Sequence, residues 1–154
     1  MEEQEKQIEE RLKLESAFKG GASWFFWIAG LSLINSIILL SGGQWNFIVG
    51  LGITQIIDSV GLAASEEAGN AAKIVSFIFD LMAAGVFVLF GVLARKGYGG
   101  AFIVGMVVYA LDGMLFLMVQ DFLSIGFHVF ALFFIYGGYS AYKKLKSMGT
   151  VSPA

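Results

Sequence analysis

Four polar side chains stand inside long apolar stretches of this 154-residue sequence. They are Asn35, Asp80, Asp112 and His128. Two carboxylates, one amide and one imidazole make an oxygen-rich set of ligands that suits a divalent cation or a proton relay. We therefore expect these residues to form a site for a cation or for protons, with Asp80, Asp112 and His128 as candidate metal ligands.

Two further candidates, Gln55 and Asp58, lie between the first two apolar blocks of the sequence. They share one face of an expected helix with Thr54 and Ser59, because the four positions follow the i, i+1, i+4, i+5 spacing. If this helix folds over the four residues named above, Gln55 and Asp58 would act as a lid or as additional ligands.

The residue types exclude several other kinds of site. The chain has no cysteine, which removes disulfides, thiol catalysis and cysteine-ligated metals. Its single histidine, His128, rules out a multi-histidine zinc site within one chain. Asp80 and Asp112 could serve as acid and base in an intramembrane enzyme. However, the sequence has no nucleophile elbow, metalloprotease signature or phosphate loop, and so favours a binding site over an enzyme.

Membrane-spanning helices are the elements that must position these side chains. Apolar residues make up 57% of the chain and charged residues only 14%, whereas soluble domains carry about 25% charged residues. The apolar residues form blocks of about 20, the length of a helix that crosses a ~30 Å hydrocarbon core. The four clear blocks are residues 23–41, 73–94, 100–119 and 122–142.

Residues 46–64 are long enough to span as well, but their polar face and glycines favour an interfacial helix or a re-entrant segment. The charges support this interpretation. If 46–64 does not cross, every basic residue except Lys73 falls on one side, as the positive-inside rule expects of the cytoplasmic side. If 46–64 crosses, the basic residues divide equally. We therefore expect four spans, both termini in the cytoplasm, and an excursion of residues 42–72 on the outer side.

The predicted fold is an all-α membrane bundle of four helices, with an additional outer interfacial or re-entrant helix between the first and second spans. The four polar residues lie at similar distances from the inner ends of their blocks, about 18–21 Å at 1.5 Å per residue. Each belongs to a stripe of small or polar residues on one helical face. The stripes are Ser32/Asn35/Ser36, Ser76/Asp80/Ala83/Ala84, Gly105/Tyr109/Asp112/Gly113 and Ser124/His128/Ala131. Turned inward, they would form one polar layer.

Charged segments flank the expected membrane domain, which covers residues 23–142. Residues 1–22 mix acids and bases, unlike the net positive start of a signal peptide. We expect them to form a cytoplasmic surface helix or a solvated tail. Residues 143–154 form a basic cytoplasmic tail, in which Lys143, Lys144 and Lys146 are expected to set orientation and to touch anionic lipid.

Two classes of function stay open at this point. In the first, the polar layer binds a cation or protons in a transporter-like or channel-like protein, and its faces converge around a cavity. In the second, the protein is a structural or accessory subunit of a membrane complex, and the same residues only hydrogen-bond to each other across helices. Expected partners are the lipid bilayer and a homo-oligomer or larger complex, whereas the net charge of −2 gives no reason to expect nucleic acid.

Overall fold

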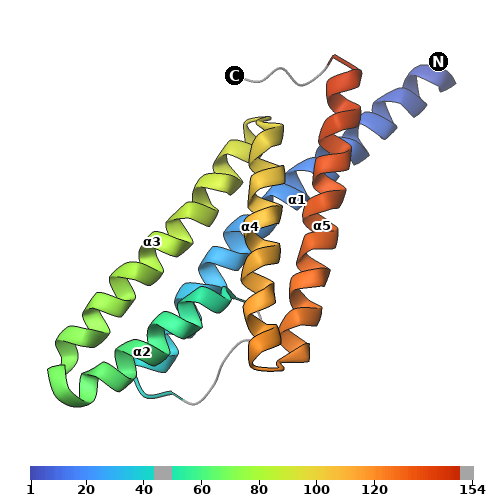
Figure 1. Cartoon of the computed structure of the whole chain (residues 1–154). Coiled ribbons are helices and arrows are strands. Elements are labelled where there is room, and N and C mark those ends of the chain that lie inside the picture. The colour runs from blue at the N-terminus through green and yellow to red at the C-terminus, as the bar shows by residue number, and fades with distance from the viewer. Residues whose placement is uncertain (44–49, 150–154) are drawn as a thin grey trace.

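The structure is a computed structural model that describes residues 1–43 and 50–149. These residues form five α-helices (Figure 1): α1 (Glu2–Leu40), α2 (Gly52–Ala68), α3 (Asn70–Arg95), α4 (Gly99–Met118) and α5 (Phe122–Ser147). The described part of the chain contains no strand. The predicted all-α fold is therefore confirmed.

Four of the helices are long and apolar enough to cross a membrane, and they are α1, α3, α4 and α5. They correspond to the four predicted spans. The short helix between the first two spans is also present, but it begins at Gly52 and ends at Ala68, not at residues 46 and 64. Residues 46–49 of that prediction lie outside the described residues.

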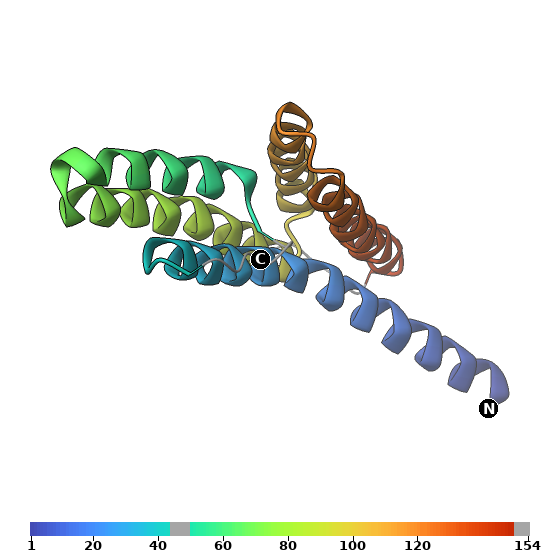
Figure 2. The same cartoon turned by 90° about the horizontal axis from the view of Figure 1, so that it is seen from below.

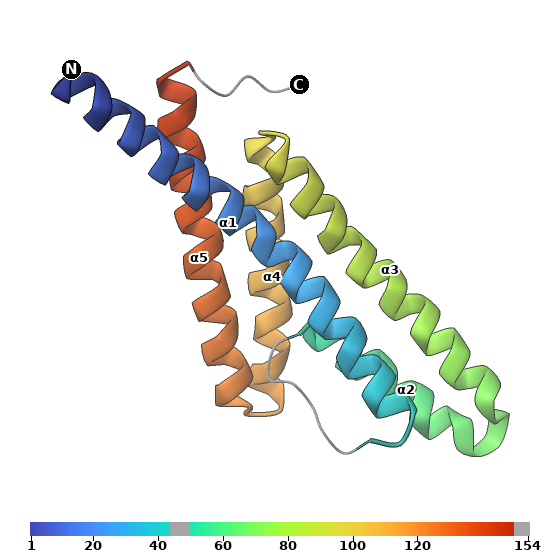
Figure 3. The same cartoon turned by 180° about the vertical axis from the view of Figure 1, so that it is seen from behind.

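The helices pack in two groups that α1 joins. α2 lies along α3, and α4 lies along α5, while α1 contacts both α3 and α5 most extensively. Figure 2 shows α2 and α3 side by side, and Figure 3 shows α1 crossing the bundle diagonally from α5 toward α2. The chain reverses between α2 and α3 at Gly69, whose φ of 63° is a left-handed conformation that favours glycine.

The interior holds polar as well as apolar side chains, while the exterior is rich in large apolar side chains, unlike that of a soluble protein. Among the described residues, ten serine, threonine, asparagine, aspartate and histidine side chains are buried, and large apolar side chains of every helix are exposed. In water such an exterior would be unfavourable, because a soluble monomer rarely exposes a contiguous apolar surface of this extent. Lipid chains remove that penalty. The four apolar helices and this exterior fit a multi-pass integral membrane protein.

The charged N-terminal segment is part of α1. This helix has 39 residues and is about 58 Å long at 1.5 Å per residue, so it extends well beyond one bilayer core. Its first buried residue is Phe18. Ion pairs one turn apart line the exposed part, with Lys13 Nζ 2.7 Å from Glu9 Oε1. Residues 2–22 are therefore helical and continuous with the first predicted span.

α1 and α5 touch through their backbones at one point. A Cβ atom on Gly21 would lie 2.5 Å from the Cα of Gly138, and one on Gly138 would lie 2.6 Å from the Cα of Gly21. Small residues at such crossings allow helix axes in membranes to approach closely. This contact fixes where α5 meets α1. It thereby also fixes the position of His128, which precedes Gly138 on α5.

Helix α5 begins with a side-chain cap. Asp121 accepts hydrogen bonds from the backbone N–H of Ser124 at 3.1 Å and from its hydroxyl at 2.6 Å. These bonds favour the charged carboxylate and hold the pKa of Asp121 below its usual range. The cap sits in the short connection between α4 and α5.

Candidate functional site

The inward-facing stripes predicted from the sequence are buried. All of the polar stripe residues are buried, including Asn35, Asp80, Asp112 and His128. Helix α2 adds Thr54 and Asp58 to the same interior. Their hydrogen bonds and electrostatic partners divide these polar residues into two groups along α2. We call them the Asp112 group and the Asp58–Asp80 pair.

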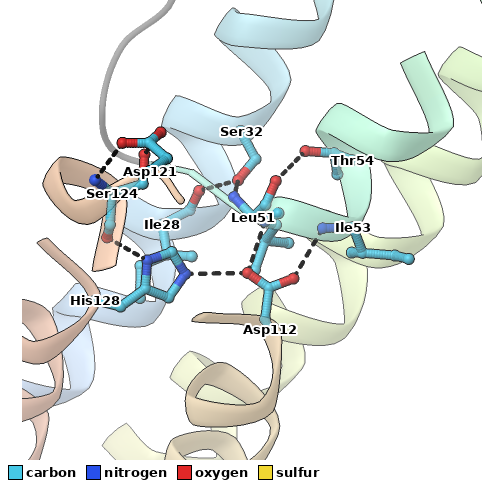
Figure 4. Close-up of polar contacts among 10 residues, drawn as sticks. Ile28, Ser32, Leu51, Ile53, Thr54, Asp112, Asp121, Ser124 and His128 are labelled. Carbon is cyan, nitrogen blue, oxygen red and sulfur yellow. Dashed lines mark hydrogen bonds and ion pairs between the residues drawn. The ribbon is translucent and has the colours of Figure 1, made fainter. Parts of the chain in front are cut away.

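The Asp112 group forms around the first turn of α2. One oxygen of the Asp112 carboxylate accepts the N–H of Gly52 at 2.7 Å, and the other accepts the N–H of Ile53 at 2.9 Å (Figure 4). The first N–H groups of a helix have no partner within the helix and carry a partial positive charge. Asp112 of α4 therefore caps a helix that lies far from it in the sequence.

His128 is the second member of the Asp112 group. Its Nδ1 lies 2.8 Å from the carbonyl oxygen of Ser124, and its Nε2 lies 3.0 Å from Asp112 Oδ2. A carbonyl can only accept, so Nδ1 carries a proton and donates it. The contact between Nε2 and the carboxylate then needs one more proton, shared between imidazole and carboxyl. The imidazole also stacks on the ring of Tyr109, with 4.2 Å between ring centroids.

Ser32 and Asn35 of α1 complete this group. The hydroxyl of Ser32 accepts the N–H of Leu51 at 2.8 Å and donates to the carbonyl of Ile28 at 2.7 Å. Asn35 lies against Gly50, since a Cβ there would be 3.0 Å from Asn35 Nδ2. Three successive N–H groups at the start of α2 thus find partners on α1 and α4. This arrangement allows a helix to begin inside the protein without orphaned donors.

The Asp58–Asp80 pair lies farther along α2. Asp58 of α2 is 1% exposed and Asp80 of α3 is 0% exposed. The polar groups that act on Asp80 are Asp58 and Ser36 of α1, and no base is among them. Oδ1 of Asp58, both carboxylate oxygens of Asp80 and Oγ of Ser36 are buried and have no hydrogen-bond partner among the described residues. Three helices therefore contribute unpaired oxygens to one place.

The predicted single layer is therefore not one cluster. Gly52 and Asp58 are six residues apart on α2, which separates the two groups by about 9 Å along the helix. Among the described residues, no three histidine, aspartate or glutamate side chains gather closely enough to hold a metal ion. Asp80, Asp112 and His128 consequently do not form a joint metal-binding group. Gln55 is half-buried on α2, and its side chain takes part in none of the hydrogen bonds of either group.

Two features of the site were not predicted from the sequence. One is that backbone N–H groups of Gly52 and Ile53 are the partners of Asp112. The sequence did contain a signal for this contact. Gly50 and Gly52 flank Leu51 just before a helical pattern, and glycine allows another chain segment to approach the backbone closely. The other is that Asp58 pairs with Asp80, for which spacing along the sequence carries no signal.

No protein-family model matches this sequence, and comparisons with curated proteins and with solved structures found no match.

Proposed function

We propose that this protein binds a proton or a small cation between Asp58 and Asp80, at membrane depth, in a transporter-like or channel-like role. The observation that carries the proposal is the pair of facing, buried carboxyl groups with no base beside them. Two ionised carboxylates in such a place repel each other and lose their hydration. A positive charge must therefore accompany them, either as a proton on one carboxyl or as a bound cation.

A proton is the occupant that the local chemistry favours. The unpaired oxygens come from two carboxyl groups and the hydroxyl of Ser36, and two carboxyl groups can share one proton without any further ligand. Calcium takes 6–8 oxygen ligands and magnesium about six, more than these side chains supply. The nearest lysine along α3, Lys73, lies about 10 Å away by helix rise, and its Nζ points to the carbonyl of Leu40 at 3.5 Å.

We further propose that α2 is a re-entrant helix and not an interfacial one. Its apolar side chains Ile53, Ile56 and Val60 are 40–63% exposed, while Thr54 and Asp58 are buried. An interfacial helix would turn its polar face to water, whereas here that face meets the other helices. The first turn of α2 lies beside Asp112, six residues before the end of α4, or about 9 Å inside that end. Non-helical backbone at such depth is tolerated where protein covers it.

The proposed orientation places both termini in the cytoplasm. The N-terminus, the α3–α4 turn and the C-terminal end of α5 lie at one end of the bundle (Figure 1). All basic residues except Lys73 belong to these segments, and positive residues concentrate on the cytoplasmic side of membrane proteins. The connection between α2 and α3 would then face the outer side.

A structural or accessory subunit is the second candidate function, and the Asp112 group favours it. Its carboxylate, imidazole and serine groups bond to each other and to backbone, as expected of a contact that only holds helices together. The two candidates make different demands on the Asp58–Asp80 pair. Only a binding site requires this pair to take up and release a charge.

The proposal is tested by the thermal stability of the detergent-purified protein across pH and in a panel of monovalent and divalent cations. The variants are Asp80→Asn and, as a matched control, Glu66→Gln, an exposed acid on α2. A ligand that binds only the folded state stabilises it. We therefore expect the Tm of the wild type to fall as pH rises, because the pair loses its proton. Asp80→Asn should lose the part of this dependence that belongs to the pair, since an amide donates to Asp58 at every pH. The part that belongs to the proton between His128 and Asp112 should remain, and Glu66→Gln should retain the whole dependence.

A cation in place of the proton would give a different result. One ion would raise the Tm of the wild type in a saturable manner at alkaline pH, and Asp80→Asn would not respond. If the wild type responds to neither pH nor ions, or Asp80→Asn keeps the wild-type response, the binding proposal is wrong and the structural role is favoured. Proteoliposomes with an internal pH indicator then show whether a bound proton is also moved across the membrane.

A further inference from the structure

One cavity of the protein lies apart from the polar interior. It has a volume of about 930 Å³, and residues of the α3–α4 turn and of the C-terminal part of α5 line it. These two segments lie at the same end of the bundle (Figure 1). Its walls come from the last turns of α3, the start of α4 and the C-terminal part of α5. The lining includes Phe90, Leu93, Tyr139, Lys143 and Lys146. We call this cavity the terminal groove.

The terminal groove combines an apolar wall with positively charged lysine side chains. Phe90 and Leu93 of α3 line one side, and Lys143 and Lys146 of α5 line the other. No aspartate or glutamate is among its lining residues. Neither lysine forms an ion pair with another described residue. The groove therefore presents two ammonium groups without counter-ions beside a surface that favours hydrocarbon.

The position of these groups matches the two parts of a lipid. Lysine side chains at helix ends reach toward the membrane surface, and tyrosine rings prefer the level of the headgroups. Tyr98 and Tyr139 line the groove, and Lys143 Nζ lies 5.9 Å from the centroid of the Tyr139 ring. The volume is within the range of about 300–1,000 Å³ that is usual for ligand sites.

We propose that the terminal groove binds one anionic phospholipid, with its phosphate at Lys143 and Lys146 and an acyl chain along Phe90 and Leu93. A free phosphate would use only the lysines and leave the apolar wall empty. A second copy of this chain related by a two-fold axis would bring the same lysines of both copies together, because such an interface uses one patch twice. An anionic lipid satisfies both surfaces at once.

The test uses the full-length protein in detergent with phosphatidylglycerol or phosphatidylcholine, and counts the retained lipids by native mass spectrometry. Lys146→Gln removes a groove charge. Lys144→Gln is the matched control, because Lys144 is exposed on the same helix and does not line the groove. A basic residue at the membrane surface contributes about 1 kcal/mol to anionic lipid binding, which is about a fivefold change in affinity.

We expect wild type to retain phosphatidylglycerol more tightly than phosphatidylcholine, Lys146→Gln to weaken that retention about fivefold, and Lys144→Gln to leave it unchanged. Gly100→Leu should also weaken retention with both lysines intact, because Gly100 lines the groove and has open space at its Cβ. The proposal fails if the two lipids bind equally, or if the lysine variants behave alike. It also fails if inorganic phosphate displaces the lipid, or if Lys146→Gln changes the oligomeric state and not the lipid count.

Discussion

At the residue scale, the two buried polar groups differ in how completely they are bonded. The Asp112 carboxylate accepts the N–H groups of Gly52 and Ile53, one on each oxygen, and shares a proton with His128, so no oxygen is left unpaired. The carboxyl groups of Asp58 and Asp80 include three oxygens that have no hydrogen-bond partner among the described residues. An unsatisfied buried polar group costs about 1–3 kcal/mol. A bound proton or cation at the Asp58–Asp80 pair would remove this cost, whereas the Asp112 group has no such cost to remove.

Asp112→Asn should lower the free energy of unfolding by about 1–3 kcal/mol. An amide has one acceptor oxygen and would turn its own N–H groups toward the N–H of Gly52 or Ile53. Hydrogen exchange should accelerate at those two amides in the variant, while exchange at Ser65, near the other end of α2, stays unchanged as an internal control. If stability and the exchange of Gly52 and Ile53 both match the wild type, Asp112 is not needed to hold the helix start.

At the element scale, the bundle depends on glycines at the points where helices come into close contact. The crossing of α1 and α5 has glycine on both helices, at Gly21 and Gly138. The start of α2 also requires glycine, but there the glycines face side chains of other helices, and a Cβ on Gly52 would lie 2.9 Å from the ring of Phe116. These contacts bring polar groups of different helices within bonding distance, so packing decides which partners meet.

Gly138→Ala should destabilise the protein by about 1–3 kcal/mol, the usual cost of excess volume in a packed interior. Its Cβ would meet the backbone of Gly21, which cannot move aside without separating the helices. The neighbouring Gly137→Ala is the matched control, because nothing lies within 4 Å of its Cβ. Unfolding by titration with a denaturing detergent compares the two. Equal stability of both variants would mean that the α1–α5 crossing is looser than described.

At the scale of the whole molecule, charge is distributed unequally between the two ends of the bundle. One end holds the N-terminus, the α3–α4 turn and the C-terminal end of α5 (Figure 1), and these segments carry almost all basic residues. The other end holds the turns that join α2 to α3 and α4 to α5. Four crossings require both termini on one side, while a spanning α2 would put them on opposite sides.

Because the chain has no cysteine, single cysteines report this topology without background. We expect Glu66→Cys to react with a membrane-impermeant maleimide on intact cells. Glu3→Cys and Ser147→Cys should react only after the membrane is permeabilised. All three positions are exposed, so lack of labelling before permeabilisation reflects sidedness and not burial. Labelling of Glu3→Cys and Ser147→Cys from opposite sides would overturn the re-entrant assignment of α2.

The sequence by itself determined the helices and their inward faces. Blocks of about 20 apolar residues set the four long helices, and spacings of three and four placed Asn35, Asp80, Asp112 and His128 on buried faces, as the structure confirms. Helical periodicity is local, so it can be read from neighbouring residues. It also placed Thr54 and Asp58 together on the polar face of the short helix.

Only the tertiary structure decided which polar groups meet. Periodicity gives the face of a helix but neither its axial offset nor its tilt relative to another helix, and those depend on contacts such as Gly21 with Gly138. Equal distances from the helix ends suggested one layer. In the structure, however, the first turn of α2 bonds to Asp112, and Asp58 of the same helix lies against Asp80. A buried helix start requires partners for its N–H groups, and a carboxylate on a distant helix supplies them here.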